Sequence, residues 1–175
     1  MCSVLTHPAV PLALSVFLPQ GTASAPLLLT GVACSVMPDL DVLSFQFGIR
    51  YNALLGHRGL SHSLGFAAVV SAVLTWTLLR QRPAGSGLIF VFLFVSTLSH
   101  GLLDMLTNGG LGVALFAPVT NQRYFFPWRP IEVSPLEIGR FFSAWGLCIL
   151  VSEGKWVWLP AAVVFVCGQI LRRYG

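Results

Sequence analysis

Gly56-His57-Arg58-Gly59-Leu60-Ser61-His62-Ser63 is the polar stretch around which the rest of this sequence is arranged. It holds two of the four histidines in the chain and stands directly before a long apolar segment. The other two, His7 and His100, lie near the ends of other apolar segments, and the chain has only three aspartates. Every histidine and aspartate falls into one of four short clusters, which indicates one site built from distant parts of the chain.

Composition indicates an integral-membrane protein. Of 175 residues, 55% are hydrophobic and 9% are charged, whereas soluble domains carry roughly 25% charged residues. A transmembrane helix needs about 20 apolar residues, so residues 1–175 allow a single integral-membrane domain. The net charge of +4 is small and spread along the chain, which excludes a basic nucleic-acid surface.

Apolar segments follow one another along the chain, at residues 8–18, 24–37, 60–80, 87–106, 139–152 and 156–171. They predict an all-α fold, a polytopic membrane helix bundle of about five to six segments. Pro38 is expected to close the second segment, and polar loops occupy about 38–59 and 107–138. Alternate threading through a membrane places both loops and every His and Asp cluster at one membrane face. The basic residues there, Arg172 and Arg173 among them, favour the cytoplasmic face by the positive-inside rule.

Two pairs of residues have the spacing of metal ligands. His100 and Asp104 are spaced i and i+4 within an apolar segment, so they share one helix face and can reach one ion. Asp39 and Asp41 follow Pro38, and two carboxylates in such a turn can chelate one ion or bridge two. The alternatives are a structural His–Asp hydrogen bond and a solvated turn. Ionisable groups within membrane segments are costly and usually functional, which favours the metal site.

The two remaining histidines of the central stretch can join this site. A turn ending at Gly59, followed at once by a helix, would aim His57 and His62 into one cavity; solvated loop positions are the alternative. Arg58 cannot ligate a metal, and it suits a substrate phosphate or carboxylate, or an aspartate of the site. His7 alone is weak evidence for a metal site, and we include it as a candidate ligand because it falls on the same membrane face as the others.

The candidate metal ligands share imidazole or carboxylate chemistry; they are His7, Asp39, Asp41, His57, His62, His100 and Asp104. Such donors suit one or two divalent ions, Zn²⁺ first and Mn²⁺ or Fe²⁺ as alternatives. Cys2, Cys34, Cys148 and Cys167 show no metal-type spacing, and we expect them to pack in apolar surroundings. Arg123 and Arg129 lie among aromatic residues, where they would bind an anionic lipid headgroup or form an interfacial belt.

The order of these motifs resembles that of the YdjM-like family of bacterial inner-membrane proteins, regarded as membrane-bound metal-dependent hydrolases. The matching elements run over about residues 5–130: His7, Pro38-Asp39-Leu40-Asp41, Gly56 to Ser63, Ser99 to Thr107, and Arg123-Tyr124-Phe125-Phe126-Pro127. Val42 stands where family members often carry a histidine. A more remote similarity is to zinc-dependent phospholipase C, in which His-x-x-x-Asp helices bind zinc. The resemblance implies a multi-pass protein of the bacterial inner (cell) membrane that carries out metal-dependent hydrolysis.

We therefore expect a membrane-bound hydrolase that cleaves a phosphoester or ester of a lipid, or of another membrane-associated substrate, through a metal-activated water. Arg58, Asp41 and Arg123 are the expected catalytic residues, and Arg58, Arg123 and Arg129 the expected substrate-binding ones. Membrane lipid is the expected partner. Two alternatives remain: a metal-ion transporter, which ligands at segment ends beside arginines disfavour, and a non-catalytic membrane protein with a structural His/Asp cluster.

Overall fold

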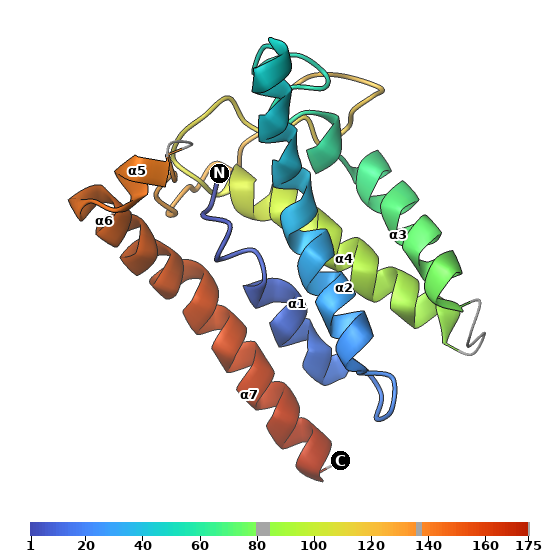
Figure 1. The fold of residues 1–175 in the computed structure, drawn as a ribbon. Coiled ribbons are helices and arrows are strands. Elements are labelled where there is room, and N and C mark those ends of the chain that lie inside the picture. The colour runs from blue at the N-terminus through green and yellow to red at the C-terminus, as the bar shows by residue number, and fades with distance from the viewer. Residues whose placement is uncertain (80–84, 136–137, 175) are drawn as a thin grey trace.

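A computed structural model of the protein describes residues 1–79, 85–135 and 138–174, and its regular elements are helices (Figure 1). The chain runs down through α1 (Ala9–Leu14) and the 3₁₀ turn η1 (Ser15–Phe17), up through α2 (Ala25–Val36), and on into η2 (Met37–Phe47). After η3 (Leu60–His62) it descends in α3 (Leu64–Leu79) and rises in α4 (Ser86–Met105). Short α5 (Ile138–Phe141) leads into α6 (Ala144–Glu153), η4 (Gly154–Trp158) and α7 (Leu159–Tyr174).

Among the described residues, three helices are long and apolar enough to cross a membrane: Ala25–Phe47, Ser86–Met105 and Ala144–Tyr174. The helix Leu64–Leu78 is also apolar but shorter. Large apolar side chains cover the outside of α7, where Val163 and Val166 are about half exposed. An apolar exterior of this kind needs lipid around it, so the predicted all-helical membrane protein is confirmed. The end of predicted segment 60–80 and two positions of predicted loop 107–138 lie outside the described residues.

The predicted end at Pro38 is confirmed for the α-helix, since α2 ends at Val36, but the prediction that a polar loop begins there is wrong. Because proline has no N–H to donate, the α-helical pattern cannot continue through it, and the chain tightens into 3₁₀ helix instead. This helix runs on to Phe47 and ends at Gly48, whose φ of +71° favours glycine. Asp39 and Asp41 consequently lie on a helix, and the polar loop begins about ten residues later than predicted.

The predicted break between the last two apolar segments is also absent. The α6 helix continues through the π-helical turn η4 into α7, so residues 139–152 and 156–171 belong mostly to one helix. The C-terminal end therefore lies opposite the N-terminus (Figure 1). There, Arg172 donates a hydrogen bond to the carbonyl of Leu18, at the far end of η1. Placing Arg172 and Arg173 on the same side as the site was wrong, and they no longer support a cytoplasmic site.

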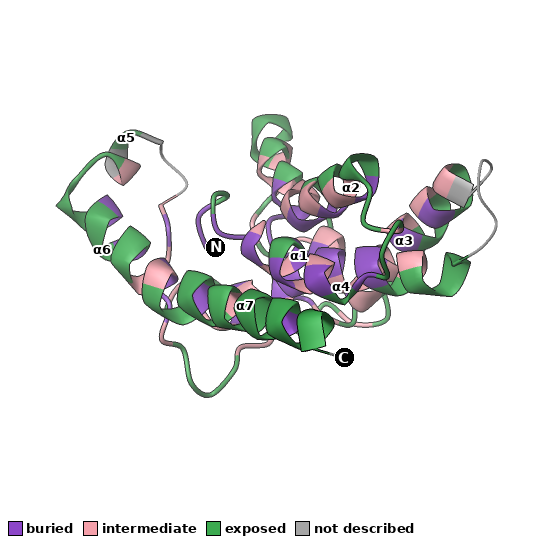
Figure 2. Cartoon of the chain, turned by 90° about the horizontal axis from the view of Figure 1, so that it is seen from below, coloured by how far each residue is buried: buried purple, intermediate pink, exposed green. Residues whose placement is uncertain are grey.

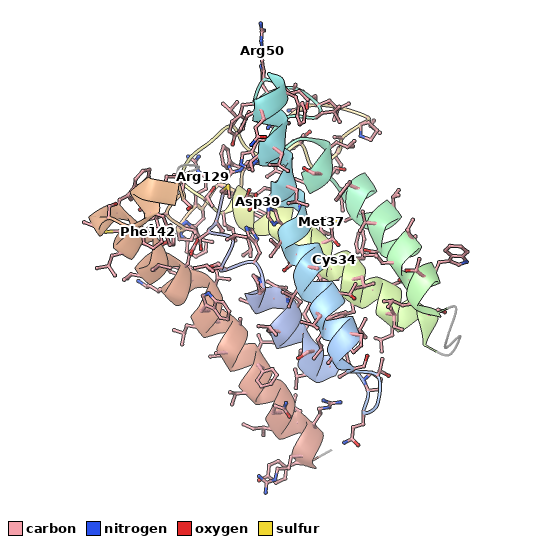
Figure 3. The ribbon with its side chains drawn as sticks, in the orientation of Figure 1. Cys34, Met37, Asp39, Arg50, Arg129 and Phe142 are labelled. Atoms are coloured by element: carbon pink, nitrogen blue, oxygen red, sulfur yellow. The ribbon has the colours of Figure 1, made fainter. Side chains whose placement is uncertain are left out.

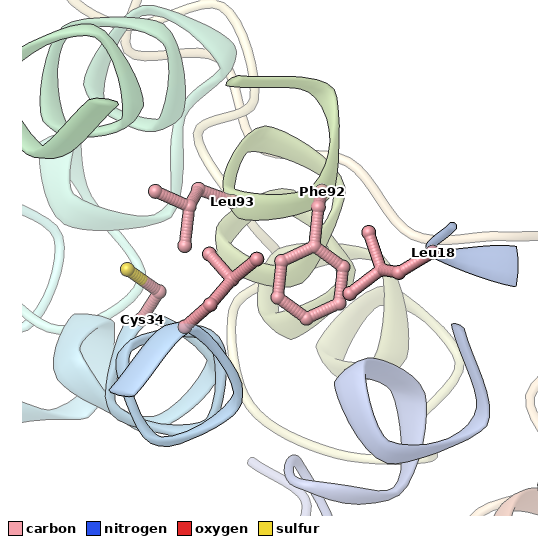
Figure 4. Close-up of a cluster of buried hydrophobic side chains, with 5 residues drawn as sticks. Leu18, Cys34, Phe92 and Leu93 are labelled. Carbon is pink, nitrogen blue, oxygen red and sulfur yellow. The ribbon is translucent and has the colours of Figure 1, made fainter. Parts of the chain in front are cut away.

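The apolar core lies between α1, α2, α3 and α4. Leu18, Cys34, Phe92 and Leu93 are nearly inaccessible and face one another there (Figure 4). Helices α2 and α4 approach closely because Gly31 has no side chain, and a Cβ at that position would lie 2.6 Å from the Phe92 ring. Seen from below, buried positions gather on α1 and α4, whereas much of α7 is exposed (Figure 2). This packing fixes the upper ends of α2 and α4 beside each other.

Candidate metal centre

Five buried side chains from separate stretches of the chain meet at the upper end of the helices. His7 precedes α1, Asp39 lies in η2, His62 ends η3, and His100 and Asp104 lie one turn apart on α4. Their exposure ranges from 0% for His7, His100 and Asp104 to 7% for Asp39. In Figure 3 Asp39 lies partway along the α2–η2 column, well below Arg50, which projects from its tip. The convergence predicted from the sequence is thus confirmed.

The distances between these groups match those of ligands that share an ion. His100 Nε2 lies 3.2 Å from Asp39 Oδ1, and His62 Nε2 lies 3.9 Å from the same oxygen. Asp104 Oδ2 is 3.6 Å from His62 Nε2, and His7 Nε2 is 3.9 Å from Asp39 Oδ2. Two donors at about 2.1 Å from one ion, at a tetrahedral angle, lie roughly 3.4 Å apart. Asp39, His62, His100 and Asp104 can therefore surround a single ion.

Most of the facing donor atoms have no hydrogen-bond partner within the described part of the chain. They are Nε2 of His7, His62 and His100 and both carboxylate oxygens of Asp39. A buried polar atom left without a partner costs about 1–3 kcal/mol. A group of five in one place is explained by a cation that accepts all of their lone pairs. The buried His/Asp cluster could thus hold a metal ion.

The far sides of two imidazoles have hydrogen-bond partners that direct their Nε2 atoms toward the cluster. His100 Nδ1 lies 2.7 Å from the carbonyl oxygen of Ser35, which can only accept, so Nδ1 carries the proton. His62 Nδ1 lies 3.1 Å from Asp41 Oδ2 and 2.9 Å from Ser61 Oγ. Such outer partners fix the ring and its tautomer in metal sites. His7 differs, because its ring stacks on His100 with centroids 3.6 Å apart and neither of its nitrogens has a hydrogen-bond partner among the described residues.

Asp41 has both of its oxygens occupied by protein donors. Oδ1 lies 2.6 Å from His57 Nδ1, and Oδ2 accepts from Ser61 Oγ at 2.7 Å and from the Arg58 N–H at 3.0 Å. The carboxylate therefore orients His57 and His62 from behind. Asp41, His57 and His62 also form a second group that could hold an ion. Direct ligation by Asp41 or His57 stays a prediction.

His57 keeps one nitrogen free beside the cluster. With Nδ1 bonded to Asp41, its buried Nε2 has no partner among the described residues. Burial lowers the pKa of His57, and the neighbouring Asp41 carboxylate offsets only part of that shift. The ring is consequently neutral at neutral pH, with Nε2 as an available acceptor.

Arg58 is fully buried and holds Asp104. Its Nε donates to Asp104 Oδ2 at 2.9 Å, while Nη1 and Nη2 donate to the Gly109 carbonyl and to Thr107 Oγ1. The backbone at Arg58 has φ +59°, an uncommon conformation for a residue with a side chain. Of the two roles predicted for this arginine, the structure shows contact with an aspartate of the site. A catalytic or substrate-binding role stays a prediction.

The two arginines of the second polar loop differ in their surroundings. Arg123 donates to backbone carbonyls of the loop at residues 51–57, which it ties to its own loop. Arg129 is exposed, and its guanidinium lies 4.8 Å from the centre of the Phe125 ring (Figure 3). Arg129 is therefore the freer of the two for binding an anionic group. The predicted catalytic role of Arg123 and substrate contacts of both remain predictions.

Sequence reasoning missed a cysteine at the site. Cys2 is fully buried, and its Sγ forms a third possible ligand group with His7 and Asp104. Its backbone N–H also donates to Asp104 Oδ1 at 2.7 Å. The expected apolar packing of Cys2 is confirmed, because it belongs to a buried apolar cluster with Ile131 and Val157; what the sequence did not show is its possible role as a ligand. Because no CxxC or CxxH spacing surrounds it, no local signal could have identified it.

A buried carboxylate outside the cluster was missed as well. Glu153 is 1% exposed and accepts hydrogen bonds from the backbone and hydroxyl of Ser3 and from Thr6 Oγ1. These bonds tie the segment that carries His7 to the last helix. In the sequence, Glu153 looked like part of a polar break between two helices.

Asp41→Asn is expected to weaken zinc affinity by about 10- to 100-fold, the usual effect of losing an outer partner of a ligand histidine. An asparagine amide cannot accept hydrogen bonds with both of its terminal atoms, so His57 or His62 loses its orientation. Competition titration with a chelating dye on detergent-purified protein measures the affinity. Glu132→Gln, at a carboxylate bonded to Asn108, is the matched control. Equal affinities in the two variants would contradict an orienting role for Asp41.

The helices and the buried cluster together define an all-helical membrane protein with a potential metal site. The chain belongs to the YdjM inner membrane protein family, whose profile matches residues 1–174. A relative in Escherichia coli (strain K12), inner membrane protein YbcI, is 42% identical over 164 residues, which cover 94% of this chain and 95% of that protein. No solved structure matches the chain. The predicted family and inner-membrane location are confirmed.

Proposed function

We propose that the protein is a metal-dependent hydrolase of the inner membrane, acting on a phosphoester or ester of a lipid or other membrane-associated substrate. The observation that carries the proposal is a set of buried donor atoms that have no hydrogen-bond partner in the described part of the chain, on His7, Asp39, His62 and His100. Imidazole and carboxylate donors suit Zn²⁺, with Mn²⁺ or Fe²⁺ as alternatives. An ion held there would polarise a phosphoryl or acyl oxygen and lower the pKa of a water toward 7.

In this proposal His57 accepts the proton of the attacking water. Its ring centroid lies 5.7 Å from that of His62, so it borders the cluster. Asp41 holds Nδ1 and leaves the free Nε2 as the acceptor, which is the arrangement of a general base oriented by a carboxylate. The role belongs to the neutral ring, which the lowered pKa of His57 favours at neutral pH.

Arg58 and Arg129 have different proposed roles: the first holds a residue of the site in place, and the second binds an anionic group. Arg58 would hold Asp104 in place through its 2.9 Å contact. Arg129, exposed over Phe125, would contact an anionic headgroup at the membrane surface. This arrangement also argues against transport, because the fully buried Arg58 places a fixed positive charge against the cluster.

The test uses detergent-purified protein loaded with zinc and incubated with defined phospholipids, with released headgroups and fatty acids measured by mass spectrometry. His57→Gln is expected to lower the rate by about 100- to 10,000-fold while bound zinc stays at the wild-type level, because a base and not a ligand is removed. Gln122→Ala, at an exposed position of the second loop, is the control. Zinc-loaded wild type that hydrolyses none of the lipid esters or phosphoesters would overturn the proposal.

A further inference from the structure

A groove of about 330 Å³ lies between α1 and α7, and none of the residues of the His/Asp cluster lines it. Small side chains create it, since alanines line both helices. Its main lining residues are Ala9, Ala13, Trp158, Ala161, Ala162 and Phe165. Farther down, the two chain segments touch where Gly168 meets Val16, and any Cβ at Gly168 would overlap the valine side chain. The groove is therefore closed below and open along its side.

The surroundings of the groove are those of a membrane span. It lies along α7, within the candidate span Ala144–Tyr174, and the neighbouring Val163 and Val164 are exposed. Figure 2 shows α7 beside α1 with much of its surface exposed. Side chains that line an apolar groove lack dispersion contacts on the side facing the groove. Within a bilayer, lipid acyl chains surround the protein and can supply those contacts. The volume also falls within the range of ligand pockets, about 300–1,000 Å³.

The upper end of the groove lies close along the chain to a residue of the candidate metal centre, His7. Trp158 lines the groove, and its Nε1 donates to Thr6 Oγ1 at 3.3 Å. Thr6 directly precedes His7, and Ala9 in the groove wall follows His7 by two residues. A lipid whose chain lies between α1 and α7 therefore has its ester or phosphoester bonds at the level of the cluster.

We infer that this groove binds one acyl chain of a membrane lipid from the leaflet on the site's side. The acyl-chain site depends only on the groove and not on the proposed function. The further statement that the bound lipid is the substrate class rests on the proposed function, because it needs the cluster to be hydrolytic.

The test uses the full-length chain in vesicles of phosphatidylethanolamine and phosphatidylglycerol, with a phosphatidylglycerol probe that carries a diazirine in one acyl chain. After irradiation, mass spectrometry is expected to find the label concentrated on peptides of α1 and of residues 158–165. Ala162→Phe fills the groove, and labelling there should fall by about fivefold or more, equivalent to about 1 kcal/mol. Val163→Phe adds the same ring at an exposed neighbour outside the groove and should leave labelling unchanged.

Ala161→Leu provides a second filling variant, and far-ultraviolet circular dichroism checks that each variant is folded. Equal labelling of wild type and both filled variants overturns the inference. Crosslinking of α7 to a second copy of the chain in place of lipid overturns it too, since the groove would then be a helix–helix interface. Labelling that is concentrated in the groove, without any lipid hydrolysis, would support the acyl-chain site and contradict the assignment of the bound lipid as substrate. Lipid hydrolysis without labelling of the groove would contradict the acyl-chain site and support the proposed function.

Discussion

Asp39→Asn is expected to abolish the stabilisation of the protein by zinc and, in metal-free protein, to raise its stability. Both oxygens of Asp39 are buried and have no partner among the described residues, so the substitution breaks no hydrogen bond. In metal-free protein the change removes a carboxylate whose burial is costly. With zinc it removes a charged ligand that lies 3.2 Å from His100 Nε2. The two effects have opposite signs, which separates a metal site from a purely structural cluster.

The measurement is thermal unfolding in detergent with and without zinc, together with zinc per chain by elemental mass spectrometry. At a zinc concentration about 100 times its Kd, wild type should gain roughly 2.7 kcal/mol and Asp39→Asn almost nothing. His62→Ala should lose bound zinc in the same way, because its Nε2 faces Asp39 and Asp104. Folded wild type that binds no Zn²⁺, Mn²⁺ or Fe²⁺ would leave a structural His/Asp cluster as the explanation.

Helix geometry and the chemistry of buried charge made most of the centre predictable. His100 and Asp104 had to share a face once their segment was recognised as a helix, and both are fully buried there. In a membrane, ionisable groups have few favourable neighbours except one another or an ion. This constraint is strong enough to bring His7 and Asp39 together with them, although nothing local in the sequence links these residues.

The separate roles of Asp39 and Asp41 could not be read from their spacing. In a turn both carboxylates can reach one ion, but on the 3₁₀ helix of the structure residues two apart project in different directions. Asp39 therefore faces His100, whereas Asp41 turns toward His57 and the backbone of Arg58. The sequence predicted a polar loop after Pro38, whereas the structure has a 3₁₀ helix there, so the directions of the two side chains could not be foreseen.

The last helix shows a different limit of local reasoning. Glu153 and Lys155 around Gly154 carry the composition of a loop, yet the chain there stays helical. The donors that accommodate the Glu153 carboxylate are Ser3 and Thr6, about 150 residues earlier in the sequence. Partners so distant leave no local pattern in the sequence. Burying a glutamate without hydrogen-bond partners costs free energy, so nothing in the sequence indicated that Glu153 is buried.

Arg58→Met is expected to lower the free energy of unfolding by about 3–5 kcal/mol, the usual result of removing one partner from a buried ion pair. Arg58 and Asp104 are both completely buried with Nε and Oδ2 2.9 Å apart, so the methionine leaves an uncompensated carboxylate. Hydrogen bonds to the Gly109 carbonyl and Thr107 Oγ1 are lost in the same step. Unfolding in detergent, followed by tryptophan fluorescence, measures the change.

Two further variants separate the ion pair from the unusual backbone of Arg58. Arg58→Gly removes the same side chain but adopts φ +59° without strain, so it should be destabilised less than Arg58→Met. Arg58→Met combined with Asp104→Asn removes both charges, and the loss should be smaller than the sum of the single losses. Additive losses, or a loss below about 1 kcal/mol in Arg58→Met, would contradict a buried pair. The coupling matters for the metal centre, because the same Asp104 oxygen that Arg58 holds lies 3.6 Å from His62 Nε2.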